Sequence, residues 1–140
     1  MNHVDDAIIL AARVFLAALF VIFGWRKLQD YSGTVRQMAH DHLPAPKLAA
    51  AASTVMEVGV GFAIAIGLFT RPFAALFALY TLATSLIEHR YWEVRGRQQV
   101  ELMEAFYKNL SIIGGFLLLY VAGPGRYSVD VLLNLPSLLS

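Results

Sequence analysis

The chain has 140 residues, of which 58% are hydrophobic and 15% charged, and its mean hydropathy is +0.59. So apolar a composition predicts an integral membrane protein, not a soluble domain. The net charge of +1 offers no basic surface for nucleic acid. The sequence has no cysteine, which excludes disulfides and cysteine-ligated iron–sulfur clusters within this chain.

Long apolar segments predict four membrane spans, at about residues 7–27, 48–70, 72–90 and 105–123. Residues 7–25 are interrupted only by Arg13 and residues 48–70 only by Glu57, so both segments are long enough to cross a bilayer. A water-soluble bundle would need a polar stripe along each helix, and "FAIAIGLF" (62–69) has none. We therefore predict an all-α fold, an integral membrane four-helix up-down bundle that forms a single domain over residues 1–140.

The connections between the spans predict their orientation. "FTRP" (69–72) is expected to be the tightest turn, with Pro72 in the first turn of the third span. The other two connections carry most of the cations: Arg26, Lys27, Arg36, Lys47, Arg90, Arg95, Arg97 and Lys108. The positive-inside rule then places both long connections in the cytoplasm and both termini outside it.

Glu57 is the one charged residue in the middle of the second span. It lies about 14 Å from Leu48 by the helical rise, at a depth where a charge costs about 2.5–3.5 kcal/mol. Such a residue is expected to face the protein interior. The other polar residues of the spans fall in the same half of the membrane: Lys27, Ser85, Glu88, His89, Lys108 and Asn109.

This group of residues allows two interpretations. Glu57 could form a structural ion pair with Lys27 or Lys108, or the group could line a polar pocket that opens toward the cytoplasmic leaflet. Gly59, Ala63 and Gly67 predict a face of small residues that packs helices closely without polar contacts. Because packing then needs no buried charge, the pocket is favoured.

A second cluster is predicted at the opposite end of the bundle. In "GPGRYSVD" (123–130), Gly123 and Gly125 are expected to end the fourth helix and turn the chain. Asp130 is predicted to pair with Arg13 or Arg71 and so to hold the C-terminal segment against the bundle. Residues 124–140 are expected to form this turn and a short interfacial tail.

Metal and haem sites are not expected. "HDH" (40–42) could supply two imidazoles, but the sequence places no further ligands nearby, so a solvated loop is predicted. His89 is the only histidine within or at the end of a span, whereas haem held between helices usually has two axial ligands.

Six motifs occur in a characteristic order along nearly the whole chain, from about Ile9 to Asp130. They are "FGWRKL", "MEVGVG", "GLFTRP", "EHRY", "YKNLSIIGG" and "GPGRYSVD". In this order the chain resembles the DoxX family of small four-helix bacterial inner-membrane proteins. The stretch "YWEVRGRQQVELMEAF" (91–106) departs from the family because it is longer and more charged than the usual connection.

The resemblance implies a place in the bacterial inner membrane and a link to quinone chemistry. The family takes its name from an association with a quinol-oxidising archaeal complex, and relatives resemble the membrane subunit of a thiosulfate:quinone oxidoreductase. On this basis the first hypothesis is a quinone-linked redox component, a subunit of a quinone-dependent oxidoreductase with a soluble or membrane redox partner. Glu57 would exchange protons, and the residues predicted to surround it would bind the quinone head group.

Two other functions compete with this one. The second hypothesis is a non-catalytic membrane adaptor whose connection 91–106 docks a soluble redox enzyme. A small-solute or lipid transporter is disfavoured, because a single bundle of four helices shows no inverted repeat. The sequence does not indicate the substrate, the partner subunit or the oligomeric state.

Overall fold

The computed structural model describes residues 2–139 and contains no strand within that range. Four helical segments are long and apolar enough to cross a membrane: His3–Gln29, Pro46–Ile66, Thr70–Glu93 and Arg97–Ala122. The predicted all-α class with four spans is confirmed. The outermost residues of the predicted domain, 1 and 140, lie outside the described range.

Nine helical elements occur within residues 2–139. They are α1 (His3–Gln29), α2 (Tyr31–His40), α3 (Pro46–Val55), the π-helix η1 (Met56–Val60), α4 (Gly61–Ile66), α5 (Thr70–Glu88), the 3-10 helix η2 (Tyr91–Glu93), α6 (Arg97–Ala122) and α7 (Val129–Leu132). The elements α3, η1 and α4 follow one another without a break and form the second span.

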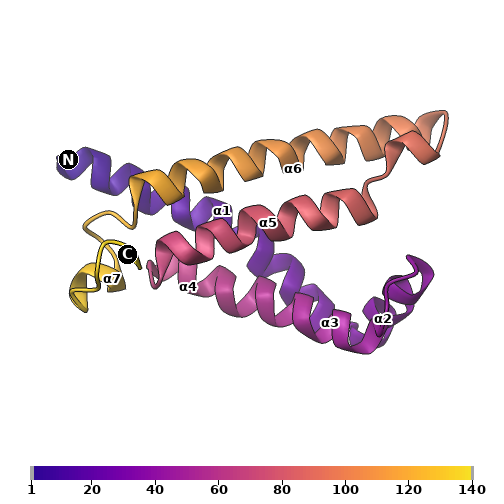
Figure 1. Ribbon diagram of the computed structural model, residues 1–140, viewed down its shortest axis with the longest axis horizontal. Coiled ribbons are helices and arrows are strands. Elements are labelled where there is room, and N and C mark those ends of the chain that lie inside the picture. Colours follow the sequence, from indigo (N-terminus) through magenta and orange to yellow (C-terminus); the bar gives the residue numbers. More distant parts are fainter. Residues whose placement is uncertain (1, 140) are drawn as a thin grey trace.

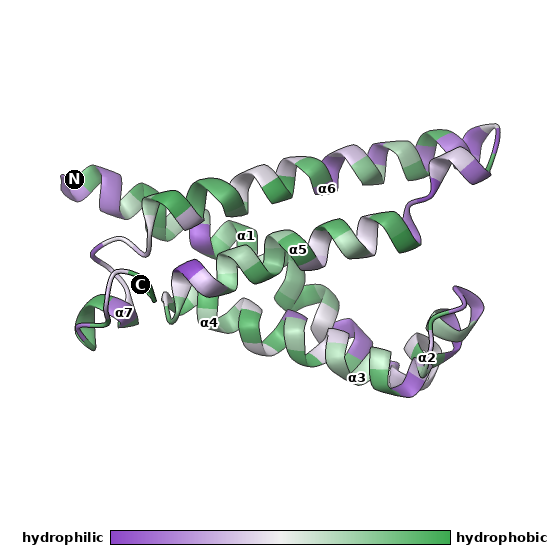
Figure 2. Cartoon of the chain, in the orientation of Figure 1, coloured by the Kyte–Doolittle hydropathy of each residue, from purple (hydrophilic) through white to green (hydrophobic). Residues whose placement is uncertain are grey.

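Successive spans run in opposite directions. Figure 1 shows both chain termini at one end of the molecule and α2 with the η2 turn at the other. Helix α1 packs mainly against η1 and α4, and α5 packs mainly against α6. In Figure 2 hydrophilic residues gather toward the two ends, whereas the middle of each span is mostly hydrophobic, as a bilayer requires.

The helix pairs meet around a core of aromatic rings. Phe20 of α1 lies 4.5 Å from Phe77 of α5 and 5.7 Å from Phe116 of α6, measured between ring centroids. Phe77 and Phe116 are stacked, with their centroids 5.2 Å apart, and both are fully buried. Other large side chains, such as Phe15 and Leu118, face outward, as they must in a protein surrounded by lipid.

The turn between the second and third spans begins two residues earlier than predicted. Helix α4 ends at Ile66, and Gly67 takes the left-handed conformation with a φ of 74°. The backbone N–H of Leu68 then bonds to the carbonyl of Ala63, which closes the helix in a Schellman arrangement. Of the sequence "FTRP" only Phe69 lies in the turn, and Thr70, Arg71 and Pro72 form the first turn of α5, as predicted for Pro72.

The predicted long connection 91–106 is mostly helical. After the short helix η2, Gly96 precedes α6, and the charged residues from Arg97 onward form the first turns of that helix. Arg97 and Glu101 pair across one turn at 3.0 Å and are largely exposed. These charged residues are exposed because the first turns of α6 extend beyond the apolar part of the span.

The first long connection also contains a helix that was not predicted. Helix α2 covers residues 31–40 and buries Met38 against the bundle. His40 ends this helix with its side chain 85% exposed, so the predicted solvated loop is restricted to the residues that follow it.

Gly59, the first residue of the predicted small-residue face, does not form a close helix contact. Gly59 is exposed, and a Cβ atom added to it would meet nothing within 4 Å. The close approach instead uses Gly24 of α1, where an added Cβ would lie 2.7 Å from Cγ2 of Val58. Gly61 faces Val21 in the same way, at 3.0 Å. These two glycines let α1 lie against η1 and α4.

Candidate functional site

Glu57 is buried where α1, η1 and α5 meet. Its side chain is 7% exposed, and Oε1 accepts hydrogen bonds from Nζ of Lys27 and from the hydroxyl of Tyr80, each at 2.6 Å. Oε2 is buried and has no hydrogen-bond partner among the described residues. One carboxylate oxygen is thus held by two donors and the other is free to accept a further hydrogen bond.

The local structure brings Glu57 to this position. The π-helical turn widens the second span at residues 56–60, and π-turns of this kind occur often at functional sites. Gly24 of α1 allows the close approach, since its missing side chain leaves room for the Cβ atom of Glu57, 2.8 Å from where a Cβ on Gly24 would be. Lys27 lies one turn further along α1 and reaches the carboxylate from there.

A cavity of about 260 Å³ opens beside Glu57 and is lined by residues of α1, η1, α5 and α6 and by His89. Its polar lining comes from the second, third and fourth spans, and its apolar lining mostly from α1. The lining residues are Leu19, Phe20, Phe23, Glu57, Tyr80, Thr81, Thr84, Glu88, His89, Ala105, Lys108, Asn109 and Ile112.

Thr81, Ser85 and Asn109 connect α5 to α6 beside the cavity. The amide of Asn109 donates to Oγ of Ser85 at 2.9 Å, and Ser85 donates to the carbonyl of Thr81 at 2.6 Å. The hydroxyl of Thr81 and Nδ1 of His89 are buried without a hydrogen-bond partner in the described part of the chain. Together with Oε2 of Glu57, three residues of the cavity wall therefore carry an unused polar atom.

Glu88 connects this cavity with a second, more polar one of about 350 Å³. The second cavity is bounded by Lys27 and Glu88 and by α2 residues that include Thr34 and Gln37. Glu88 and Lys27 therefore lie between Glu57 and the long-connection end of the molecule. This arrangement gives the buried carboxylate a polar route toward that end.

The structure brings together every residue predicted for the pocket. Glu57, Glu88, His89, Lys108 and Asn109 line one cavity, Lys27 binds Glu57, and Ser85 binds Asn109. The two interpretations of the sequence are not exclusive, because the Lys27–Glu57 ion pair and the polar cavity both exist. Lys108 lies on the cavity wall and is not the partner of Glu57 in the ion pair.

Tyr80 is a part of the site that the predicted pocket does not include. It lies within the apolar run "FAALFALY" (73–80), whose other residues are all hydrophobic. A signal was present, since tyrosine in a membrane span usually lies at the interface, and a hydroxyl buried deeper needs a partner.

The opposite end of the bundle is fixed by Asp130, although not through the predicted ion pair. Its carboxylate accepts from the backbone N–H of Phe69 at 2.7 Å and from the N–H and hydroxyl of Thr70 at 2.9 and 2.7 Å. Asp130 forms no ion pair within 4.0 Å in the described range. The prediction of a direct pair with Arg13 or Arg71 is wrong, because the carboxylate caps the free N–H groups at the start of α5.

Arg13 and Arg71 lie near this cap and bind the C-terminal segment differently. Arg13 is fully buried and donates to the carbonyl of Tyr127. Arg71 lies against Gly123, where an added Cβ would come within 3.2 Å of its guanidinium group. Helix α6 ends at Ala122, and Gly123 and Gly125 both have positive φ, as predicted for residues that turn the chain.

Fold and site together define a small four-helix membrane protein that buries a paired carboxylate beside a polar cavity at mid-span. The chain belongs to the DoxX family, whose model matches residues 8–90. It is 46% identical over 123 residues to Inner membrane protein YphA of Escherichia coli (strain K12), with 88% of each chain covered.

A second relative from the same organism, Inner membrane protein YqjF, is 37% identical over 134 residues, which covers 96% of this chain and 98% of the relative. No solved structure matches the chain significantly. The family model ends at residue 90, so the residues of α6 at the site lie beyond it. The alignments with both relatives are long enough to extend beyond that point.

Proposed function

We propose that this protein is a quinone-linked redox component of the bacterial inner membrane and binds the head group of a quinone or a similar amphiphile in the cavity beside Glu57. The location rests on the family and on two relatives that are named inner membrane proteins. One observation carries the proposal of a ligand: Glu57, Thr81 and His89 each have a buried polar atom without a partner in the described structure, and all three line the same cavity. Unsatisfied buried polar groups are costly, so a ligand that binds them gains free energy.

The donors and acceptors of the cavity fit both forms of a quinone. The carbonyl oxygens of the oxidised form would accept from Lys108, Asn109 and Thr81, and a hydroxyl of the reduced form would donate to Oε2 of Glu57. A bound quinone would supply the redox chemistry by taking up two electrons and two protons. Glu57, with Lys27 and Tyr80 on its other oxygen, would hold a proton near the head group.

The electrons would have to come from another protein. The sequence has no cysteine for a dithiol or a cysteine-ligated cluster, so we propose that this chain acts as the membrane partner of a redox enzyme. The exposed, charged first turns of α6 are a candidate surface for that partner. A non-catalytic adaptor that binds no ligand of its own would use the same surface.

Binding of decylubiquinone and of its reduced form, decylubiquinol, to the purified protein in lipid nanodiscs tests the proposal. Thr81→Val is expected to weaken binding of decylubiquinone about tenfold, because valine offers no donor to a quinone carbonyl. Glu57→Gln is expected to weaken binding of decylubiquinol about tenfold, because an amide N–H at the position of Oε2 cannot accept from the quinol hydroxyl. Glu101→Gln makes the same chemical change as Glu57→Gln on the exposed part of α6 and should bind like the wild type.

Folded Glu57→Gln protein that binds decylubiquinol as tightly as the wild type would overturn this assignment, and so would a wild-type protein that binds neither form. The adaptor hypothesis predicts a different pattern. In that case Arg97→Glu would release a co-purifying partner, whereas Glu57→Gln would not.

A further inference from the structure

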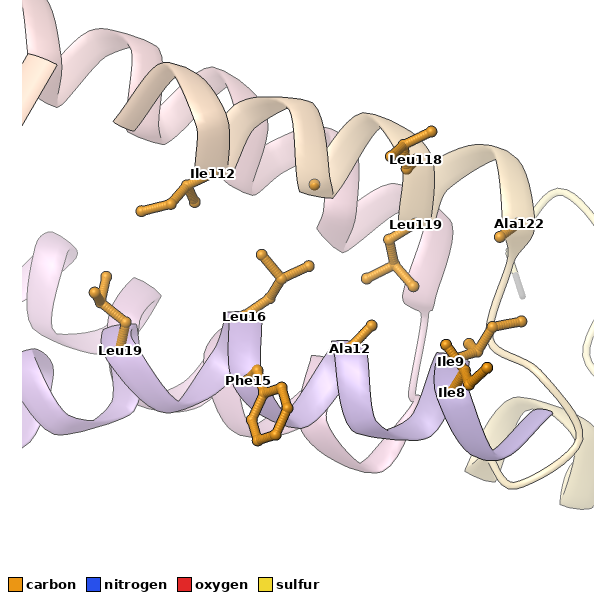
Figure 3. A pocket seen from close by; sticks show the side chains of 11 residues that line it. Ile8, Ile9, Ala12, Phe15, Leu16, Leu19, Ile112, Leu118, Leu119 and Ala122 are labelled. Carbon is orange, nitrogen blue, oxygen red and sulfur yellow. The ribbon is translucent and has the colours of Figure 1, made fainter. Parts of the chain in front are cut away.

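An apolar groove runs between α1 and α6. These two helices pack against each other less closely than α1 packs against α4 or α6 against α5. Its volume is about 490 Å³, and every side chain that lines it is aliphatic or aromatic. Figure 3 shows Leu16 of α1 and Leu119 of α6 pointing into the space between the two helices. We infer that this groove holds the isoprenoid tail of the same molecule whose head group lies beside Glu57. The inference rests on the proposed function and specifies its ligand.

The groove and the polar cavity are adjacent. Leu19 of α1 and Ile112 of α6 line both spaces. From Leu19 the groove follows α1 back to Ile8, a distance of about 16 Å by the helical rise. On the facing helix it extends from Ile112 to Ala122, so both walls continue in the same direction away from the cavity.

The division of polar and apolar residues matches an amphiphile with one polar end. The cavity of about 260 Å³ is at or below the size of pockets that enclose a whole drug-sized ligand, so it can take a ring but not a long tail. The groove offers no hydrogen-bonding side chain, and a head group placed there would leave its polar atoms unpaired. A ligand that uses both spaces therefore has its ring at Glu57 and its tail between α1 and α6.

The charges around the cavity favour a neutral head group over the phosphate of a membrane lipid. Glu57 and Glu88 both line the cavity, and the ammonium group of Lys27 is already engaged by Glu57. Among the described residues, Lys108 is the one lysine or arginine that lines the cavity. An anionic phosphate would be repelled by these carboxylates, whereas a quinone ring would not.

Quinones with the same ring and different tails test this inference. Ubiquinone-0, which has no tail, and decylubiquinone are titrated against wild-type protein in nanodiscs and against Ala12→Phe and Ala122→Phe. Both substitutions fill the groove at positions far from Glu57. Val121→Phe is the matched control, because Val121 is 73% exposed on α6 and does not line the groove.

We expect Ala12→Phe and Ala122→Phe to bind decylubiquinone about tenfold more weakly than the wild type, which corresponds to the loss of about two buried methylene groups. Their affinity for ubiquinone-0 should equal that of the wild type. Each variant is compared with the wild type for the same quinone, so partitioning of the tail into the bilayer affects both equally. The midpoint of thermal unfolding shows whether each variant is folded, and one folded variant of the two is enough for the test.

The outcomes separate this inference from the proposed function. If both quinones bind the wild type and the filled groove weakens neither, the tail lies elsewhere and the inference is wrong, while the head-group site stands. If the groove variants weaken ubiquinone-0 equally, the groove acts only through the shape of the cavity, and the inference also fails. If neither quinone binds the wild type, the proposed function itself is wrong.

A lipid is the alternative occupant of the groove. Displacement of decylubiquinone by phosphatidylglycerol in the nanodisc would identify a lipid acyl chain as the occupant instead.

Discussion

Glu57 connects three elements through a single oxygen atom. Lys27 approaches it from α1 and Tyr80 from α5, each at 2.6 Å, while the carboxylate itself belongs to η1. Buried ion pairs add little net stability, since desolvating the charges costs about as much as their attraction returns. Removing one partner is different, because the other charge then stays buried without compensation.

This asymmetry predicts the order of stability among variants of the pair. Lys27→Met leaves a buried carboxylate with Tyr80 alone and should cost about 1–3 kcal/mol. Glu57→Gln should cost less, because the amide oxygen still accepts from Tyr80 and the side chain of Lys27, 24% exposed, can be hydrated. Thermal unfolding in detergent measures both, and the double variant should be more stable than Lys27→Met. A Lys27→Met protein as stable as Glu57→Gln would show that the carboxylate is not held by this ion pair.

The residues that could be predicted at this scale are those whose depth follows from counting along a helix. The rise per residue places Lys27, Glu57 and Asn109 in the same half of the bundle, and they do meet around the cavity. Tyr80 and the partners of Asp130 could not be found in this way. The first is hidden in an apolar run. Two of the three groups that donate to Asp130 are backbone N–H groups, which cannot be recognised in a sequence.

At the scale of helices, close packing depends on which glycine faces a neighbour. The sequence contains several small residues in the second span, but their spacing does not reveal which face turns toward α1. The π-helical turn at residues 56–60 changes that face, and a local change in helix pitch is not visible in a hydrophobic pattern. For this reason the spans were predicted correctly, whereas Gly59 was assigned to a contact that Gly24 makes.

The two glycines can be separated by the same substitution. Gly24→Ala places a methyl group 2.7 Å from Val58 and should destabilise the protein by about 1–3 kcal/mol, since α1 must move away from η1. Gly59→Ala meets nothing within 4 Å and should be neutral or stabilising by about 0.5–1 kcal/mol. Midpoints of thermal unfolding measure the difference. Equal destabilisation by both substitutions would mean that α1 does not approach the second span at Gly24.

The whole molecule has two ends of different character. One end holds the Glu57 cavity and α2. At the other end Asp6 accepts from the backbone of Arg126, and Asp130 caps α5, so the N-terminal helix, the turn before α5 and the C-terminal segment are held together. On the proposed function, the first end would exchange ligand and protons through its polar cavities, whereas the hydrogen bonds of the second end hold three chain segments together. The direction in which the first end faces therefore decides which compartment the site communicates with.

The distribution of cations predicts that the Glu57 end faces the cytoplasm, and the absence of cysteine makes a clean test. Ser32 at the start of α2 and Ser137 after α7 are both exposed and lie at opposite ends, and Ser→Cys is nearly isosteric. In intact spheroplasts a membrane-impermeant maleimide should label Ser137→Cys, and Ser32→Cys should react only after lysis. The wild-type chain, without a thiol, is the background control. The reverse pattern would make the cavity open to the periplasm, and labelling of both variants before lysis would mean that the chain inserts in both orientations.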